Sequence, residues 1–154
     1  MKKTLLTLFA IFFSSFFVCA QNKNKDLYLA ISQNKTEKAI DLLKTGADAN
    51  YILSVGQWMK VSMLISAVNN KNVDIVKLLL ERKVDVNWHD GFNTTALMYA
   101  ATKGNRNIVD MLLDSGADIN ATDGKGNTVL TAAKESKNDE LIKYIEDKLK
   151  EKDK

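Results

Sequence analysis

Hydrophobic and polar positions recur along the chain in a fixed order with a period of 33 residues. Residues 47–50, 84–87 and 117–120 share one pattern, in which Asp and Asn each follow a small or aliphatic residue. The second and third copies lie 33 residues apart and the first lies 37 before the second, so the first connection holds four extra residues. The same offsets align two further sets of positions: Leu27, Leu64, Leu97 and Leu130, and Ala30, Ala67, Ala100 and Ala133. Such a period indicates stacked units that share one core.

Each unit contains two segments with helical patterning. Residues 96–101 form a short, Ala-rich apolar run, which predicts a small helix that packs closely against its neighbours. Across residues 105–114 the large apolar side chains lie at i, i+1, i+4 and i+5, on one face of a second helix. Gly104 and Gly116 can take a positive φ and end these helices. The expected core is Leu64, Ala67, Ile75, Val76, Leu79, Leu97, Ala100, Ile108, Val109, Leu112, Leu130 and Ala133.

The repeating unit resembles the ankyrin repeat. Residues 123–133, DGKGNTVLTAA, are similar to the opening D-x-x-G-x-T-P-L-H-x-A of that family, and residues 107–120, NIVDMLLDSGADIN, match its second helix and outgoing turn. The resemblance implies an all-α ankyrin repeat solenoid of about four helix-turn-helix repeats with short hairpin-like finger loops. The expected units are residues 25–50, 57–87, 90–120 and 123–149, within a domain of residues 21–149 that is followed by a charged tail, residues 150–154.

The chain departs from the ankyrin pattern at three kinds of position. Met63, Ala96 and Val129 replace the family's Pro, and Ile65, Met98 and Thr131 replace its His. In the family this His and the Thr before the Pro link neighbouring turns, so we expect a less stiff array. Between the helices, the family's Gly is kept only as Gly104; the other units carry Asn34, Lys71 and Lys137.

The first twenty residues have the three-part pattern of a secretory signal. Lys2 and Lys3 precede a nearly continuous apolar run, and Val18 and Ala20 occupy the −3 and −1 positions of a small-residue cleavage site. The run is short for a bilayer span, which needs about 20 residues. We expect residues 1–20 to be removed and the mature chain to begin at Gln21, in a bacterial periplasm or secreted.

Two alternatives for this segment remain. It is an N-terminal anchor if it is not cleaved, and Cys19 is lipid-modified if the segment acts as a lipoprotein signal. Phe17 and Val18 fit a lipobox poorly, because a small residue usually precedes the lipid-bearing Cys. Cleavage after Ala20 removes the only Cys, which suits an oxidising compartment.

Composition argues against catalysis, against a metal site and against nucleic-acid binding. The formal charge of +3 falls to +1 without Lys2 and Lys3, too small for binding led by phosphate neutralisation. His89 is the only His, no nucleophile motif accompanies it, and a zinc site needs several Cys or His ligands. Asp48, Asp85 and Asp118 recur at the repeat period and therefore mark a turn. We expect a monomeric, non-catalytic protein with no cofactor and no metal.

The resemblance also implies where a partner binds. Ankyrin fingers and first helices line a concave surface, and family recognition positions lie at the finger tips and the exposed end of the first helix. We expect partner contacts from these positions and from nearby aromatic residues: Tyr51, Trp58, Met59, Val61, Asn69, Asn70, Trp88, His89, Phe92, Thr94, Lys103, Lys125 and Asn127.

The first finger carries the four-residue insertion and is unusually apolar. Its sequence over residues 51–60, YILSVGQWMK, exposes apolar area that a connecting turn normally avoids. We predict a binding patch formed by Tyr51, Trp58, Met59, Trp88 and Phe92, since Tyr and Trp often anchor interfaces. In the alternative, the finger folds back and buries Tyr51, Ile52, Leu53 and Trp58.

These observations predict a non-catalytic protein-binding module that acts outside the cytoplasm. Similar exported bacterial ankyrin proteins suggest two finer roles. One is an immunity-type inhibitor of a toxin or enzyme, and the other is an accessory factor for an envelope or stress enzyme.

Overall fold

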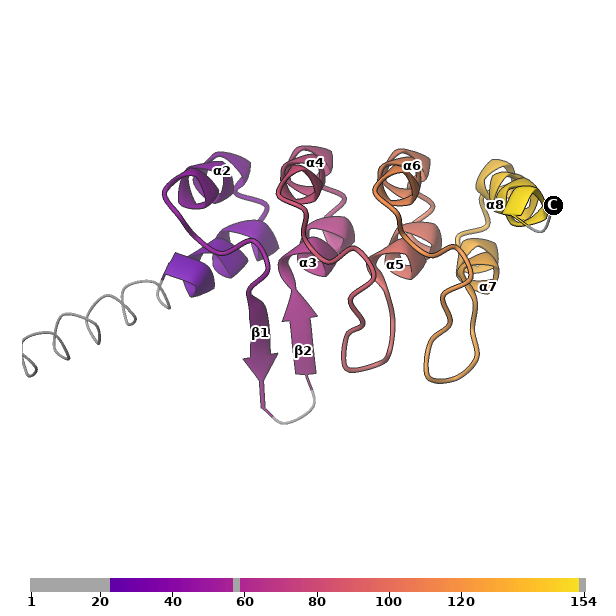
Figure 1. Ribbon diagram of the computed structural model, residues 1–154, viewed down its shortest axis with the longest axis horizontal. Helices are drawn as coiled ribbons and strands as arrows, with labels where there is room; N and C mark the ends of the chain where they lie inside the picture. Colours follow the sequence, from indigo (N-terminus) through magenta and orange to yellow (C-terminus); the bar gives the residue numbers. More distant parts are fainter. Residues whose placement is uncertain (1–22, 57–58, 153–154) are drawn as a thin grey trace, which may run out of the picture.

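Pairs of antiparallel helices stack side by side in a single row (Figure 1). The computed structural model describes residues 23–56 and 59–152. The inner helices cover residues 23–32, α3 (Met63–Asn69), α5 (Ala96–Thr102) and α7 (Val129–Glu135). The outer helices are α2 (Thr36–Lys44), α4 (Val73–Glu81), α6 (Arg106–Asp114) and α8 (Asp139–Lys152). The predicted helical repeat solenoid is confirmed, while the expected signal segment lies outside the described residues.

The inner helices begin at hydroxyl caps. Ser62, Thr95 and Thr128 each accept a hydrogen bond on the side-chain oxygen from the backbone N–H three residues later, at 3.1 to 3.3 Å. In α7 the bond is reciprocal, because Thr131 Oγ1 accepts from the Thr128 N–H at 2.7 Å. Such caps satisfy backbone donors that have no partner within the helix. Thr131, which stands at the family's His position, therefore helps to start its own helix.

Asparagines cap the outer helices α4, α6 and α8, and two of these asparagines also tie successive units together. Asn72 Oδ1 and Asn138 Oδ1 accept from backbone N–H groups of α4 and α8, at 3.0 and 3.1 Å. Their side-chain amides reach back one unit, from Asn72 to Asn34 Oδ1 at 2.6 Å and from Asn138 to the Gly104 carbonyl at 3.3 Å. Each side chain thus serves a helix end and a contact between repeats.

The short turn between the two helices of each unit requires a left-handed residue. Gly104 has φ +66°, and Asn34, Lys71 and Lys137 take φ between +54° and +56° at the equivalent positions. Asn tolerates this region more readily than Lys, which has no local compensation. The turn geometry is therefore retained although only one unit keeps the Gly.

A second ladder of asparagines runs along the turns that follow the outer helices. The side-chain oxygens of Asn50 and Asn87 accept from the backbone N–H of Asp85 and Asp118, one unit further on, at 3.2 and 2.8 Å. Each Asp carboxylate in turn accepts from the N–H two residues later, as Asp85 does from Asn87 at 3.0 Å. The recurring Asp and Asn therefore close one turn and attach the next.

The core is continuous through the stack. Of the predicted core positions, all are buried except Leu130, which is half-buried. The prediction for Leu130 was wrong because the equivalent Leu27, Leu64 and Leu97 are covered by a following unit. In the described chain no unit follows the fourth one, so the same side chain is left partly open to water.

The insertion in the first finger forms a β-hairpin. Strand β1 (Ile52–Val55) pairs antiparallel with β2 (Met59–Ser62), in a register that places Ile52 opposite Ser62. The other two fingers contain only isolated bridges, His89 with Thr95 and Thr122 with Thr128. The hairpin projects beside these two fingers in Figure 1. Four additional residues therefore lengthen a finger that the other units also possess.

Stability should depend on whether a leucine is covered by the next unit. Leu97→Ala and Leu112→Ala remove fully packed side chains, and each should lower the free energy of unfolding by about 2–5 kcal/mol. Leu130→Ala removes the same group from a half-buried site and should cost clearly less. Urea unfolding followed by circular dichroism measures all three. Equal losses for Leu97→Ala and Leu130→Ala would contradict the stacking argument.

Asn138 allows the two roles of the capping asparagines to be separated. Asn138→Ser keeps a cap for α8, but its side chain is too short to reach Gly104. The free energy of unfolding should therefore fall by about 0.5–1.5 kcal/mol. Asn138→Ala loses the cap as well, which should add about 0.5–2 kcal/mol. The same urea titration measures both variants. A midpoint of Asn138→Ser equal to that of the unchanged protein would show that the bond between units contributes nothing, and equal midpoints for the two variants would show the same of the cap.

Candidate protein-binding surface

The finger tips present large apolar side chains to solvent. Phe92 is 70% exposed and Met59 is 51% exposed, and they lie in the third-unit finger (residues 88–95) and in β2. Besides Leu29, they are the exposed large hydrophobic residues of the part of the chain that the structure describes. Isolated apolar side chains are common on protein surfaces, so the support beneath Phe92 matters more than its exposure.

A single carboxylate holds the finger that carries Phe92. Asp90 Oδ1 accepts from the backbone N–H groups of Phe92 and Thr94, both at 2.9 Å. Asp90 Oδ2 accepts from the hydroxyl of Tyr99 on α5 at 2.7 Å. Burial, and then the hydrogen bond to Asp90, raise the pKa of the Tyr99 phenol above its ordinary value of 10.0. The helix layer therefore positions the loop that presents Phe92.

The fourth-unit finger (residues 121–128) repeats this design with its own side chains. Asp123 Oδ1 accepts from the N–H groups of Lys125 and Asn127, at 2.7 and 2.9 Å, and Asn127 Nδ2 donates to Asp123 Oδ2 at 2.8 Å. The Asn127 side-chain bond is the main reason that the pKa of Asp123 lies below its usual value. Asn127 is thus engaged in closing its own turn, whereas Lys125 is exposed.

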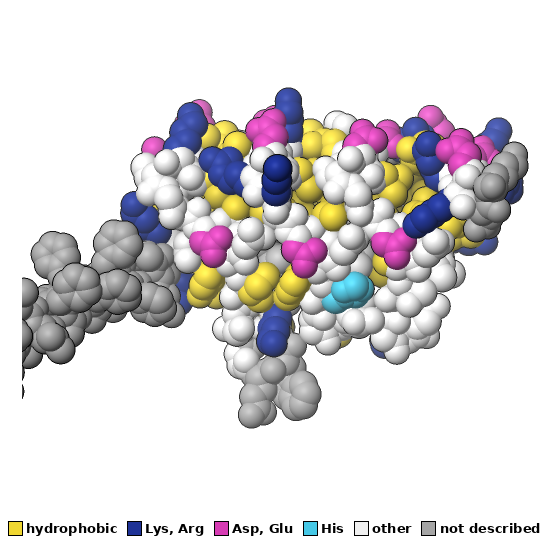
Figure 2. All heavy atoms as spheres, in the orientation of Figure 1, with side chains coloured by type: hydrophobic (Ala, Val, Ile, Leu, Met, Phe, Trp, Pro, Cys, Tyr) yellow, Lys and Arg dark blue, Asp and Glu magenta, His cyan; other side chains and the backbone are white. Residues whose placement is uncertain are grey.

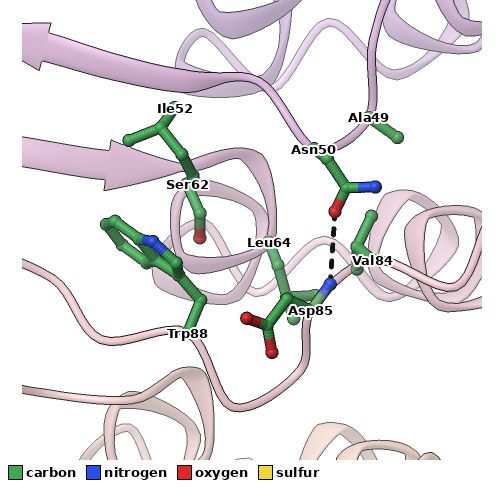
Figure 3. A pocket seen from close by; sticks show the side chains of 8 residues that line it. All are labelled: Ala49, Asn50, Ile52, Ser62, Leu64, Val84, Asp85 and Trp88. Atoms are coloured by element: carbon green, nitrogen blue, oxygen red, sulfur yellow. Dashed lines mark hydrogen bonds between the residues drawn. The ribbon is translucent and has the colours of Figure 1, made fainter.

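A hollow of about 210 Å³ lies at the base of the hairpin, between the first two fingers. Ile52, Leu64, Val84 and the indole of Trp88 form its apolar walls (Figure 3). Asp85 stands among them with its carboxylate turned toward Trp88, and its backbone N–H is held by Asn50. The hollow therefore combines apolar walls with one acidic group.

Comparison with known proteins agrees with this architecture. A family model of ankyrin repeats, in three copies, matches residues 27–123. The chain belongs to the ankyrin repeat family. No curated protein matches it. Ankyrin repeats are protein–protein interaction modules and typically non-catalytic, and the structure adds a fourth ankyrin unit, α7 and α8, at the end of the matched region.

The ankyrin structure separates the predicted contact residues into two groups. Exposed on the fingers and inner helices are Met59, Asn69, His89, Phe92, Lys103, Lys125 and Asn127. Half-buried are Tyr51, Val61, Asn70, Trp88 and Thr94. Asn70 has a structural bond, because its side-chain amide donates to the Ile31 carbonyl at 2.7 Å. Trp58 lies outside the described residues.

The first ankyrin finger matches neither the fully exposed nor the fully folded-back arrangement that the sequence left open. Tyr51, Ile52 and Leu53 are half-buried, so they are neither fully exposed nor absorbed into the core. Trp88 is half-buried and lines the hollow. The hollow itself was missed from the sequence. Its only signal was Trp88, which stands three residues after Asp85, where the next unit has Ala121 after Asp118.

The described residues can also be compared with the requirements of a metal site and of a membrane span. Within residues 23–56 and 59–152 no group of three or more His, Cys, Asp or Glu is placed to hold a metal ion. None of the helices described there is long and apolar enough to cross a bilayer. In Figure 2, acidic side chains recur along the base of the fingers, with hydrophobic side chains close by.

Tyr99 should make the protein sensitive to alkaline pH. Because its pKa is raised by folding, its contribution to stability is complete below the unfolded value of about 10 and is lost as pH rises above it. The free energy of unfolding should fall more steeply between about pH 10 and about pH 12 in the unchanged protein than in Tyr99→Phe. Urea titrations across this range give the slope of the unfolding free energy against pH. Equal slopes for the two proteins would show that Tyr99 is not the cause of the alkaline sensitivity.

Proposed function

We propose that the protein binds another protein outside the cytoplasm, through its finger tips and the concave face formed by the inner helices. The observation that carries this proposal is Phe92, an exposed aromatic side chain on a loop that Asp90 and Tyr99 hold in place. Large aromatic residues on a surface are the type that most often anchors interfaces. A loop that only connected two helices would not need these hydrogen bonds to hold an exposed Phe in a fixed position.

Preorganisation of the fingers favours this role energetically. Binding costs free energy when loops and side chains must become ordered at the interface. Here the hydrogen bonds of Asp90 and Asp123 order two fingers in the free protein. The two asparagine ladders fix the spacing between successive units, and hence between fingers. A partner therefore meets a surface whose shape is already set.

The place of action follows from the N-terminal sequence. Residues 1–20 carry a basic start, an apolar run and a small-residue site before Gln21, which together are typical of secretory signals. Loss of that segment also removes Cys19, the only thiol of the chain. Within an extracytoplasmic role, an inhibitor of a toxin or enzyme and an accessory factor for an envelope enzyme are the two specific versions. A toxin gene next to this one would favour the inhibitor.

Affinity capture from the extracytoplasmic fraction of the native cells tests the proposal. The protein itself should be recovered there with Gln21 as its first residue. A defined partner should be retained by the unchanged protein and lost with Phe92→Ala, or with Phe92→Ala combined with Trp58→Ala. The melting temperature of Phe92→Ala should stay nearly the same, because the side chain is 70% exposed. Mass spectrometry of the bound fraction provides the measurement.

The matched control is Lys77→Ala, which truncates another exposed side chain, on the outer helix α4. This variant should keep the partner. If Phe92→Ala and the double variant with Trp58→Ala both retain the partner, or if Lys77→Ala loses it equally, the finger face is not the interface. Recovery of the protein only from the cytoplasm, with residues 1–20 attached, would refute the place of action.

A further inference from the structure

The hollow beside Trp88 combines features that suit one particular type of side chain. Its volume of about 210 Å³ lies below the about 300–1,000 Å³ that is typical of small-molecule sites. A hollow of this size suits a single long side chain of a partner better than a whole small molecule. Ile52, Leu64 and Val84 offer aliphatic contacts along its walls. The stem of the side chain that enters must accordingly be apolar.

The end of that side chain must be able to pair with a carboxylate. Asp85 borders the hollow, and one of its oxygens accepts the backbone N–H of Asn87 at 3.0 Å. None of the ion pairs between described residues involves Asp85. Covering a carboxylate with a purely apolar group removes its water and gives nothing in return, which is unfavourable. A cation at this point keeps the carboxylate satisfied, and the face of Trp88 attracts the same charge.

The chain already contains such a pairing at the equivalent position of a later unit. Asp118 stands in the same turn as Asp85, one repeat further on. Lys152, in the last turn of α8, donates from Nζ to Asp118 Oδ1 at 3.1 Å. Lys152 also lines a depression together with Ile119 and Tyr144. The turn of Asp118 therefore receives a lysine from the same chain, whereas Asp85 borders the hollow and has no ion-pair partner among the described residues.

We propose that the hollow at Trp88 receives a lysine side chain from an extended segment of the partner protein, with its ammonium group on Asp85. This inference rests on the proposed function and names the chemistry of the partner at one point of the same face. The stem of the lysine lies against Ile52, Leu64 and Val84, and the ammonium group lies between Asp85 and Trp88. The partner segment thus carries at least one exposed lysine and crosses the base of the hairpin.

The site can be tested with blocked pentapeptides, without knowledge of the partner. The probe is Val-Ser-Lys-Ser-Val, acetylated and amidated at its ends, and its matched control has norleucine in place of lysine, which keeps the stem and removes the ammonium group. The protein, expressed from its full sequence and labelled with nitrogen-15, is titrated while the indole N–H signal of Trp88 is followed by NMR. Trp58→Phe assigns that signal, because the chain has two Trp residues.

The lysine peptide should shift the Trp88 signal. Norleucine in its place should weaken binding by about tenfold or more, as expected for the loss of a charge-assisted hydrogen bond. Asp85→Asn should have a similar effect while its side-chain oxygen still accepts from Asn87. Asp48→Asn makes the same charge change in the same turn one unit earlier, and it should leave binding nearly unchanged.

Three results would overturn the inference. The Trp88 signal does not move with the lysine peptide, the norleucine peptide binds equally well, or Asp48→Asn weakens binding as much as Asp85→Asn. If the peptide fails while Phe92→Ala still abolishes capture of the native partner, the hollow is not a lysine site and the proposed function stands. If capture is independent of Phe92 as well, both proposals fail.

Discussion

The contact between successive repeats is the interaction on which the rest of this structure depends. A pair of helices as short as α3 and α4 cannot enclose its apolar face by itself, since isolated helices of this length are marginal in water. Burial is completed by the neighbouring unit, as the leucine at one repeated position demonstrates. Leu27 is buried with a unit after it, whereas Leu130, in the last unit that the structure describes, is half-buried. The fold is therefore a property of the row and not of its members.

Polar side chains give that row its regular spacing. Apolar contact is not directional and would tolerate slippage between units, whereas the bonds from Asn50 and Asn87 to the next turn have a defined geometry. Asn72 and Asn138 add a second connection at the outer helices. The fingers project from turns that these bonds position, so the same asparagines that hold the stack together also hold the proposed binding face. Stability and recognition thus share one set of contacts.

Sequence reasoning succeeded where the repeat imposed the same environment on several residues. The helix pairs and nearly all core positions followed from the period, and positive φ at Gly104 followed from its place between helices. Reasoning was weaker where a unit lacks a neighbour or carries an unusual residue. Leu130 was expected in the core because its equivalents are, and this error comes from treating units as interchangeable. The bond from Asn70 to Ile31 was not anticipated either, because it joins side chain and backbone of two different units.

By itself the sequence determined the class of fold, the number of units and the faces of the helices, because these depend on patterns within 33 residues. It also pointed to the fingers as the exposed apolar regions. Only the tertiary structure decided how the inserted residues of the first finger pair as β1 and β2, how Tyr99 supports Asp90, and how Trp88 and Asp85 frame a hollow. Those features arise from contacts between an insertion and its surroundings, or between side chains of different elements. A repeat pattern cannot predict these features, because the other units do not share them.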